Sequence, residues 1–228
     1  MSLAPPLPAA PGAASHTDWR LYRRWVLATA LGELVGFLAP ATAGVVMTRV
    51  VIGMEGWLAP LLTLIVVVAA GSLEGAALGY AQWLALRRSL PAIGWRQWTG
   101  ATALAGVLAW VLGMTPNTLV DALGLGSGAL LLAWLLAAPG ILLSIGTAQW
   151  LVLRRHVARA GLWIPANIAG WILGLAATFG GASLISETMP IALALAIGVA
   201  SGVLMGIVVG LVTGLALLTL VRRRLAVN

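Results

Sequence analysis

Six long apolar stretches, separated by short polar segments, dominate the sequence. They fall at about residues 25–47, 57–86, 97–114, 128–153, 162–185 and 190–221. A helix needs roughly 20 apolar residues to cross the hydrocarbon layer of a bilayer. The pattern therefore predicts an all-α polytopic membrane protein with six transmembrane helices in one domain, residues 23–224. Residues 1–22 are expected to form a disordered cytoplasmic tail, and residues 225–228 a cytoplasmic end.

One stretch at the end of the second apolar segment recurs along the chain. GYAQWLALRR at residues 79–88 returns as GTAQWLVLRR at residues 146–155, and a weaker copy, GLALLTLVRR, occupies residues 214–223. The first, third and fifth segments share a pattern as well, because each opens on a tryptophan, Trp25, Trp98 or Trp163. Self-similarity at a fixed period indicates a repeat architecture. We predict three tandem two-helix repeats, at about residues 23–88, 95–155 and 162–223, arranged as a pseudo-threefold bundle.

The string GxAQWLxLRR, followed by a helix that opens on tryptophan, resembles a family of bacterial polytopic membrane proteins of uncharacterised function in which this unit recurs in tandem. The resemblance covers the second to fifth segments well and the first and sixth loosely. It implies a membrane location, but it brings no activity, ligand or site residue with it.

The distribution of charge predicts how the chain is oriented in the membrane. Charged residues make up only 8% of the chain and hydrophobic ones 61%, and the net charge of +7 comes from arginines in small groups between apolar segments. An even number of spans separates these groups, so all but Arg49 fall on one side, which the positive-inside rule makes cytoplasmic. We expect a multi-pass protein of the bacterial cytoplasmic membrane with both termini in the cytoplasm. The scattered arginines do not predict a nucleic-acid partner.

Aromatic and basic residues at the span ends are typical of a membrane interface. We expect contacts with lipid headgroups from Arg24, Arg87, Arg88, Arg154, Arg155, Arg222, Arg223, Trp83 and Trp150. The tryptophans Trp25, Trp95, Trp98 and Trp163 are expected in the same interfacial belt.

Glycines at intervals of four residues form ridges along two of the predicted helices. They are Gly71, Gly75 and Gly79 in the second span, and Gly202, Gly206, Gly210 and Gly214 in the sixth. Small residues let membrane helices approach closely, so both ridges are predicted to be helix-packing seams.

A few polar residues lie inside the apolar segments and are the candidates for a functional site. Five of them fall at one depth below the cytoplasmic interface, Thr29, Gln82, Thr102, Gln149 and Asn167. Two acids, Glu33 and Glu74, lie deeper, where a charged side chain is costly and suggests a function. One interpretation is a site for an ion, a proton or another ligand; the other is hydrogen bonding between helices and a neutral buried acid.

Enzymatic chemistry has little support in the sequence. The chain has no cysteine, and its histidines, His16 and His156, lie outside the apolar segments, so no metal or haem site is predicted. We expect a non-enzymatic membrane subunit or scaffold that packs against other membrane subunits or its own copies. No cofactor is predicted, and the candidate ligands for its grooves are membrane lipid, quinone or pigment. The alternative is a small-solute or proton-coupled transporter that uses Glu33 and Glu74.

Overall fold

The computed structural model describes residues 16–186 and 188–225 and contains six α-helices. They are α1 (His16–Val50), α2 (Leu58–Leu86), α3 (Trp95–Leu123), α4 (Ser127–Leu153), α5 (Trp163–Ala182) and α6 (Ile191–Leu225), with a short 3-10 helix, η1 (Ala160–Leu162), before α5. All six are long and apolar enough to cross a membrane, and the described residues contain no strand. The predicted all-α fold with six transmembrane helices is confirmed, and the chain is a multi-pass membrane protein.

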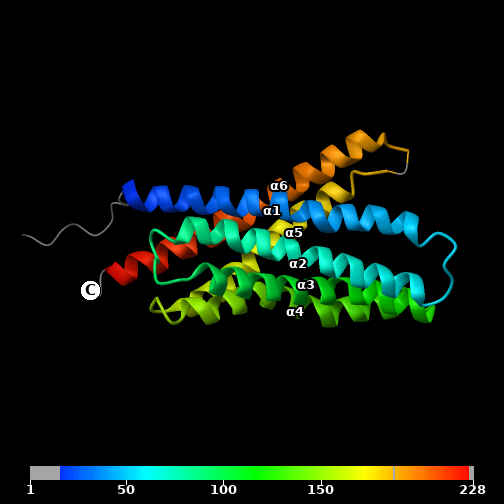
Figure 1. Ribbon diagram of the computed structural model, residues 1–228, viewed down its shortest axis with the longest axis horizontal. Coiled ribbons are helices and arrows are strands. Elements are labelled where there is room, and N and C mark those ends of the chain that lie inside the picture. Colours follow the sequence, from blue (N-terminus) through cyan, green and yellow to red (C-terminus); the bar gives the residue numbers. More distant parts are fainter. Residues whose placement is uncertain (1–15, 187, 226–228) are drawn as a thin grey trace, which may run out of the picture.

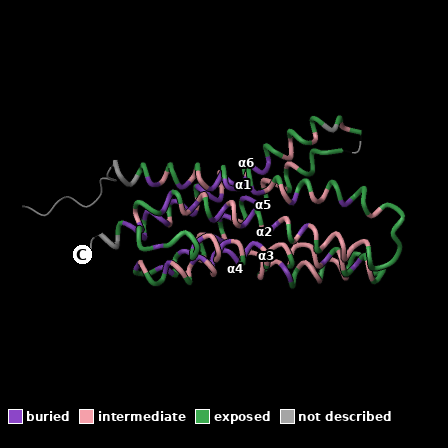
Figure 2. The backbone as a smooth tube through the Cα atoms, viewed as in Figure 1, coloured by how far each residue is buried: buried purple, intermediate pink, exposed green. Residues whose placement is uncertain are grey.

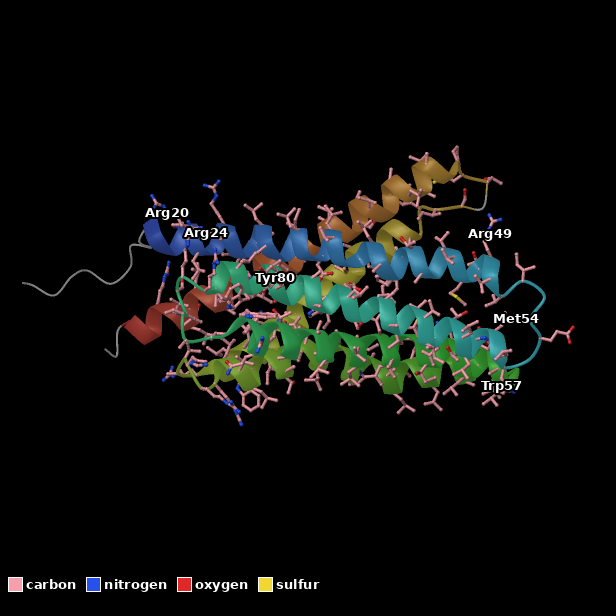
Figure 3. All side chains as sticks on the ribbon, in the orientation of Figure 1. Arg20, Arg24, Arg49, Met54, Trp57 and Tyr80 are labelled. Carbon is pink, nitrogen blue, oxygen red and sulfur yellow. The ribbon has the colours of Figure 1, made fainter. Side chains whose placement is uncertain are left out.

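The helices form a closed ring. Each helix packs against its neighbours in sequence, and α1 completes the ring by packing against α6. The helices alternate in direction, so the beginning of α1 and the end of α6 lie at the same end of the bundle (Figure 1). Arg20 and Arg24 lie at this end, and Arg49 lies at the other (Figure 3). We call them the arginine end and the opposite end.

Two predicted boundaries were wrong. Helix α1 begins at His16, so residues 16–22 are helical rather than part of a disordered tail, while residues 1–15 and 226–228 lie outside the described structure. The third span was expected to stop near Met114, but α3 continues through Pro116 to Leu123 and ends at Gly124 in the left-handed conformation. The hydroxyls of Thr115 and Thr118 donate to the backbone carbonyls of Val111 and Met114, one turn earlier in α3.

The two halves of the bundle are packed differently. Buried residues concentrate in the arginine half, whereas the opposite half is mostly exposed or partly exposed (Figure 2). The hairpin of α5 and α6 also leans away from the other helices toward the opposite end (Figure 1). Among the described side chains, none before Ser201 in α6 is buried, and none after Gly174 in α5 is buried. The core of the protein is therefore the arginine half.

Candidate functional site

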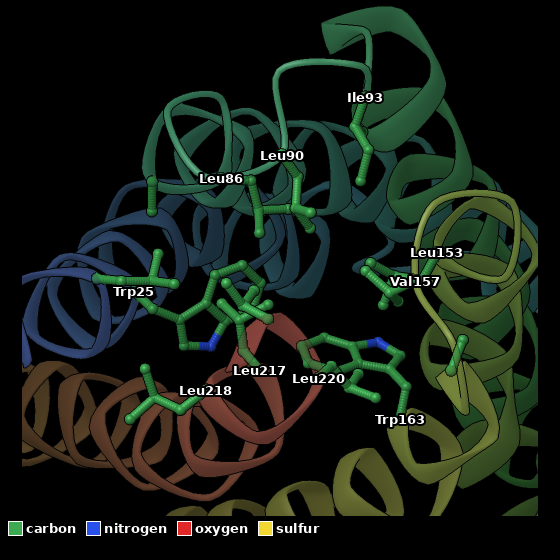
Figure 4. Close-up of a cluster of buried hydrophobic side chains, with 14 of the residues drawn as sticks. Trp25, Leu86, Leu90, Ile93, Leu153, Val157, Trp163, Leu217, Leu218 and Leu220 are labelled. Atoms are coloured by element: carbon green, nitrogen blue, oxygen red, sulfur yellow. The ribbon is translucent and has the colours of Figure 1, made fainter. Parts of the chain in front are cut away.

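Three tryptophans meet at the centre of the arginine half. Trp25, Trp98 and Trp163 each have no exposed surface, and their rings pack edge to face with centroids 5.5–6.2 Å apart. Leucines from the even-numbered helices surround them (Figure 4). The expectation that these three rings belong to an interfacial belt is therefore wrong. We call them the tryptophan triad.

Trp83 and Trp150 lie at the surface of the arginine end, as an interfacial position requires. Each is partly exposed and lies under the guanidinium of an arginine four residues later, with Arg87 Cζ 5.5 Å and Arg154 Cζ 4.9 Å from the ring centroids. The other predicted headgroup contacts with described side chains are exposed at the same end, namely Arg24, Arg88, Arg155 and Arg222. The side chain of Arg223 lies outside the described residues.

Directly beneath the triad, polar side chains from four helices form a hydrogen-bonded layer. Gln149 Nε2 donates to Gln82 Oε1 at 2.8 Å and to Thr102 Oγ1 at 3.0 Å, and Gln82 Nε2 donates to Thr29 Oγ1 at 3.4 Å. Asn167 instead donates to the carbonyl of Trp163 in its own helix, at 3.0 Å. The structure thus brings four of the five predicted residues into one network, and leaves Asn167 beside it. We call Thr29, Gln82, Thr102 and Gln149 the glutamine layer.

The tryptophan triad is tied to this layer by its indole N–H groups. Trp98 Nε1 donates to Gln82 Oε1 at 3.3 Å, and Trp163 Nε1 donates to Gln149 Oε1 at 3.0 Å. In the third helix pair the position of the glutamines is taken by Leu217, which cannot accept. Trp25 Nε1 donates instead to Thr213 Oγ1, one turn earlier in α6, at 2.9 Å. Sequence reasoning missed Thr213, although a hydroxyl four residues before Leu217 is the signal that could have found it.

Glu33 and Glu74 come together further along the axis, at the junction of α1, α2, α3 and α6. Glu33 has no exposed surface and Glu74 is 9% exposed. Glu74 packs against α1 next to the turn that carries Glu33, because a Cβ added to Gly36 would come 3.2 Å from Glu74 Cγ, so the two acids are neighbours. Trp110 Nε1, from α3, donates to Glu74 Oε2 at 2.8 Å. The role of Trp110 as the donor to Glu74 could not be read from the sequence, because it depends on the register of α2 against α3.

The glycine ridges lie where the helices approach most closely. A Cβ on Gly79 would come 2.8 Å from Thr102 Cβ, and one on Gly75 would come 3.0 Å from Ala103 Cα, while Gly71 lies against the ring of Trp110. On α6, Cβ atoms at Gly206, Gly210 and Gly214 would come within 2.9–3.0 Å of α1. Gly202 differs, because its nearest neighbour would be Phe37 Cδ1 at 3.8 Å. The α6 ridge is tight only toward the arginine end.

Taken together, the site consists of the glutamine layer and of Glu33 and Glu74, which we call the acid pair. Thr29, Thr102, Gln149 and Glu33 have no exposed surface, so no solvent-filled cavity touches them. No group of three or more histidine, cysteine or acidic side chains able to hold a metal ion occurs among the described residues. No family model, curated protein or solved structure matches the chain.

Proposed function

We propose that the protein is a non-enzymatic scaffold of a bacterial cytoplasmic membrane, with both termini in the cytoplasm. It packs against other membrane subunits or copies of itself and holds lipid or pigment in its grooves. The observation that carries this proposal is the dry axis of the arginine half. A solute path through the ring would have to pass the tryptophan triad and the glutamine layer, where hydrogen bonds join the helices and no exposed surface remains on most side chains.

Apolar grooves on the outer surface support the binding part of the proposal. A groove of about 310 Å³ lies between α1 and α6 in the opposite half, and Thr42 is the polar side chain among apolar residues such as Leu34, Phe37 and Leu195. A second groove of about 360 Å³ lies between α3 and α4, with Gln97 and Arg155 beside Leu104 and Leu151. Apolar grooves of this size on a membrane protein suit a lipid chain or a linear pigment.

We further propose that the three helix pairs are tandem repeats, like those of the bacterial family that the sequence resembles. Support comes from the equivalent places of Trp25, Trp98 and Trp163 and from the matching acceptors of Trp98 and Trp163. A duplicated unit explains why chemically similar side chains meet on one axis. The acid pair has no counterpart, because the positions that match Glu33 are Gly106 and Trp171.

The test of the scaffold role is purification from native membranes in mild detergent, followed by identification of the proteins, lipids and pigments that accompany the chain. Gly198 lines the α1–α6 groove and has open space around it, so Gly198→Leu fills the groove without a clash. Gly113 on α3 also has open space around it, which makes Gly113→Leu the matched control. We expect Gly198→Leu alone to lose the bound lipid or pigment. Unchanged co-purification by both variants would contradict binding in this groove.

A second candidate function, a proton-coupled transporter, is favoured by the acid pair alone. Buried carboxyl groups within membrane helices commonly mark ion or proton paths. Reconstitution into vesicles distinguishes the two functions. Uptake of a small solute that is driven by a pH gradient and abolished by Glu33→Gln and Glu74→Gln would support transport. If the wild-type protein takes up no solute, the result supports the scaffold.

A further inference from the structure

The acid pair lies at the level of the axis where side-chain hydrogen bonding is incomplete. Four buried side-chain polar atoms lack a partner among the described residues, and three of them are Glu33 Oε1, Glu33 Oε2 and Trp171 Nε1. Glu33 is eight residues beyond Trp25, and Trp171 is eight residues beyond Trp163. Because the rings of Trp25 and Trp163 are in contact, both residues lie roughly 12 Å beyond the triad along the helices.

The neighbours of the pair leave its charge uncompensated. From α3, Trp110 supplies one neutral N–H to Glu74. From α6, Gly206 lies against the Glu33 side chain, where an added Cβ would come 3.0 Å from Glu33 Cβ. The nearest acidic or basic groups along α1, α2, α3 and α6 lie at or near the helix ends. Two adjacent carboxylates without a cation at this depth would repel each other strongly.

Hydrogen-bond geometry offers a simple resolution of this repulsion. If Glu33 carries a proton, its O–H donates to Glu74, and Glu74 then accepts both this bond and the N–H of Trp110. This leaves one negative charge, on Glu74, with two donors, and it gives Glu33 the partner that it otherwise lacks. A third acidic or histidine ligand that would favour a metal ion is absent from the described residues.

Access to the pair differs between the two ends. Toward the arginine end, two packed levels separate it from solution. The first is the glutamine layer, and the second is the tryptophan triad together with Leu86, Leu153 and Leu220, which have no exposed surface. Toward the opposite end, buried residues are sparse and α6 leans away (Figures 1 and 2). The groove between α1 and α6 begins at Leu34 and Gly202, next to Glu33 and one turn from Gly206.

We propose that Glu33 and Glu74 share a single exchangeable proton, which enters and leaves only from the opposite end. The pair is a one-proton binding site inside the membrane, sealed from the side that carries the arginines. This inference is independent of the scaffold role, since a scaffold can hold a proton without moving a solute. Transport would add a second opening that the proposal does not require.

Infrared spectroscopy of the protein in vesicles tests the proposal directly, with the proton as the probe. The wild-type protein is expected to show the carbonyl band of a protonated carboxyl, and Glu33→Gln is expected to remove it. Glu55→Gln is the matched control, because Glu55 is an exposed acid in the loop between α1 and α2. Persistence of the band in Glu33→Gln, or its absence in the wild-type protein, would overturn the shared proton.

The direction of access is tested with the wild-type protein alone, so it does not depend on the folding of a variant. The membranes are prepared as two populations of vesicles, one with each end of the bundle facing outward, and only the outer pH is raised. We expect the band to fall when the opposite end faces outward and to remain when the arginine end does. Loss of the band from the arginine side, or a band that responds on neither side, would overturn the proposal.

Discussion

The arginine half and the opposite half of the bundle are built from similar apolar helices but differ in what holds them together. In the arginine half, glycine ridges bring backbones into contact, and the tryptophan triad and glutamine layer join helices by hydrogen bonds. In the opposite half, hydroxyls such as those of Thr48 and Thr115 bond to carbonyls of their own helices. The comparison shows that apolar character alone does not close a membrane bundle.

The difference has a physical origin in the solvent of a membrane protein. Lipid is as apolar as leucine, so helices gain little by burying leucine against leucine, and close approach and interhelical hydrogen bonds must drive packing. Both devices occur together in the arginine half. Where they stop, beyond Gly206 on α6, the α1–α6 groove begins.

The largest expected effect compares two glycines of the same helix, α6. Gly210 lies in the arginine half, where a Cβ would come 3.0 Å from Val26 Cα, whereas Gly198 has nothing within 4 Å. Gly210→Leu must push α1 away, at a cost of about 3 kcal/mol, the upper part of the usual range for overpacking. Gly198→Leu should leave the thermal midpoint in detergent unchanged. If both variants lose the same stability, the two halves are equally packed and the comparison fails.

An intermediate effect is expected from the glutamine layer. Gln149→Leu removes three hydrogen bonds, to Gln82, Thr102 and Trp163, at about 0.6 kcal/mol each in a membrane bundle, or about 2 kcal/mol in total. Thermal unfolding in detergent measures the loss.

The third helix pair suggests a rescue for this variant. There a leucine replaces the glutamine, and the threonine one turn earlier, Thr213, accepts the indole N–H. The matching change is Ile145→Thr, so the double variant with Gln149→Leu should recover the bond from Trp163 and part of the stability. No recovery would mean that the helix pairs are not equivalent at this position.

The sequence predicted features that depend on position along a helix, and missed those that depend on direction around it. Thr29, Gln82, Thr102 and Gln149 were placed at one depth by counting residues, and they form one layer. Counting could not tell whether Trp25 faces lipid or the axis, because an interfacial ring and a buried ring at that level have the same hydropathy. The third span was likewise predicted to end too early, near Met114, because hydropathy does not show that the backbone stays helical through Pro116 to Leu123.

The smallest expected effect isolates one hydrogen bond of the triad. Thr213→Val keeps the shape of the side chain but removes the acceptor of Trp25 Nε1, at a cost of about 0.6 kcal/mol. Thr219, on the same helix, is exposed and donates only to the carbonyl of Leu215, so Thr219→Val is the matched control and should be neutral. Thermal midpoints of both variants, measured side by side in one detergent, resolve the difference. An equal loss in the two would show that the bond from Trp25 adds nothing to the closure of the ring, and that edge-to-face packing of the triad suffices.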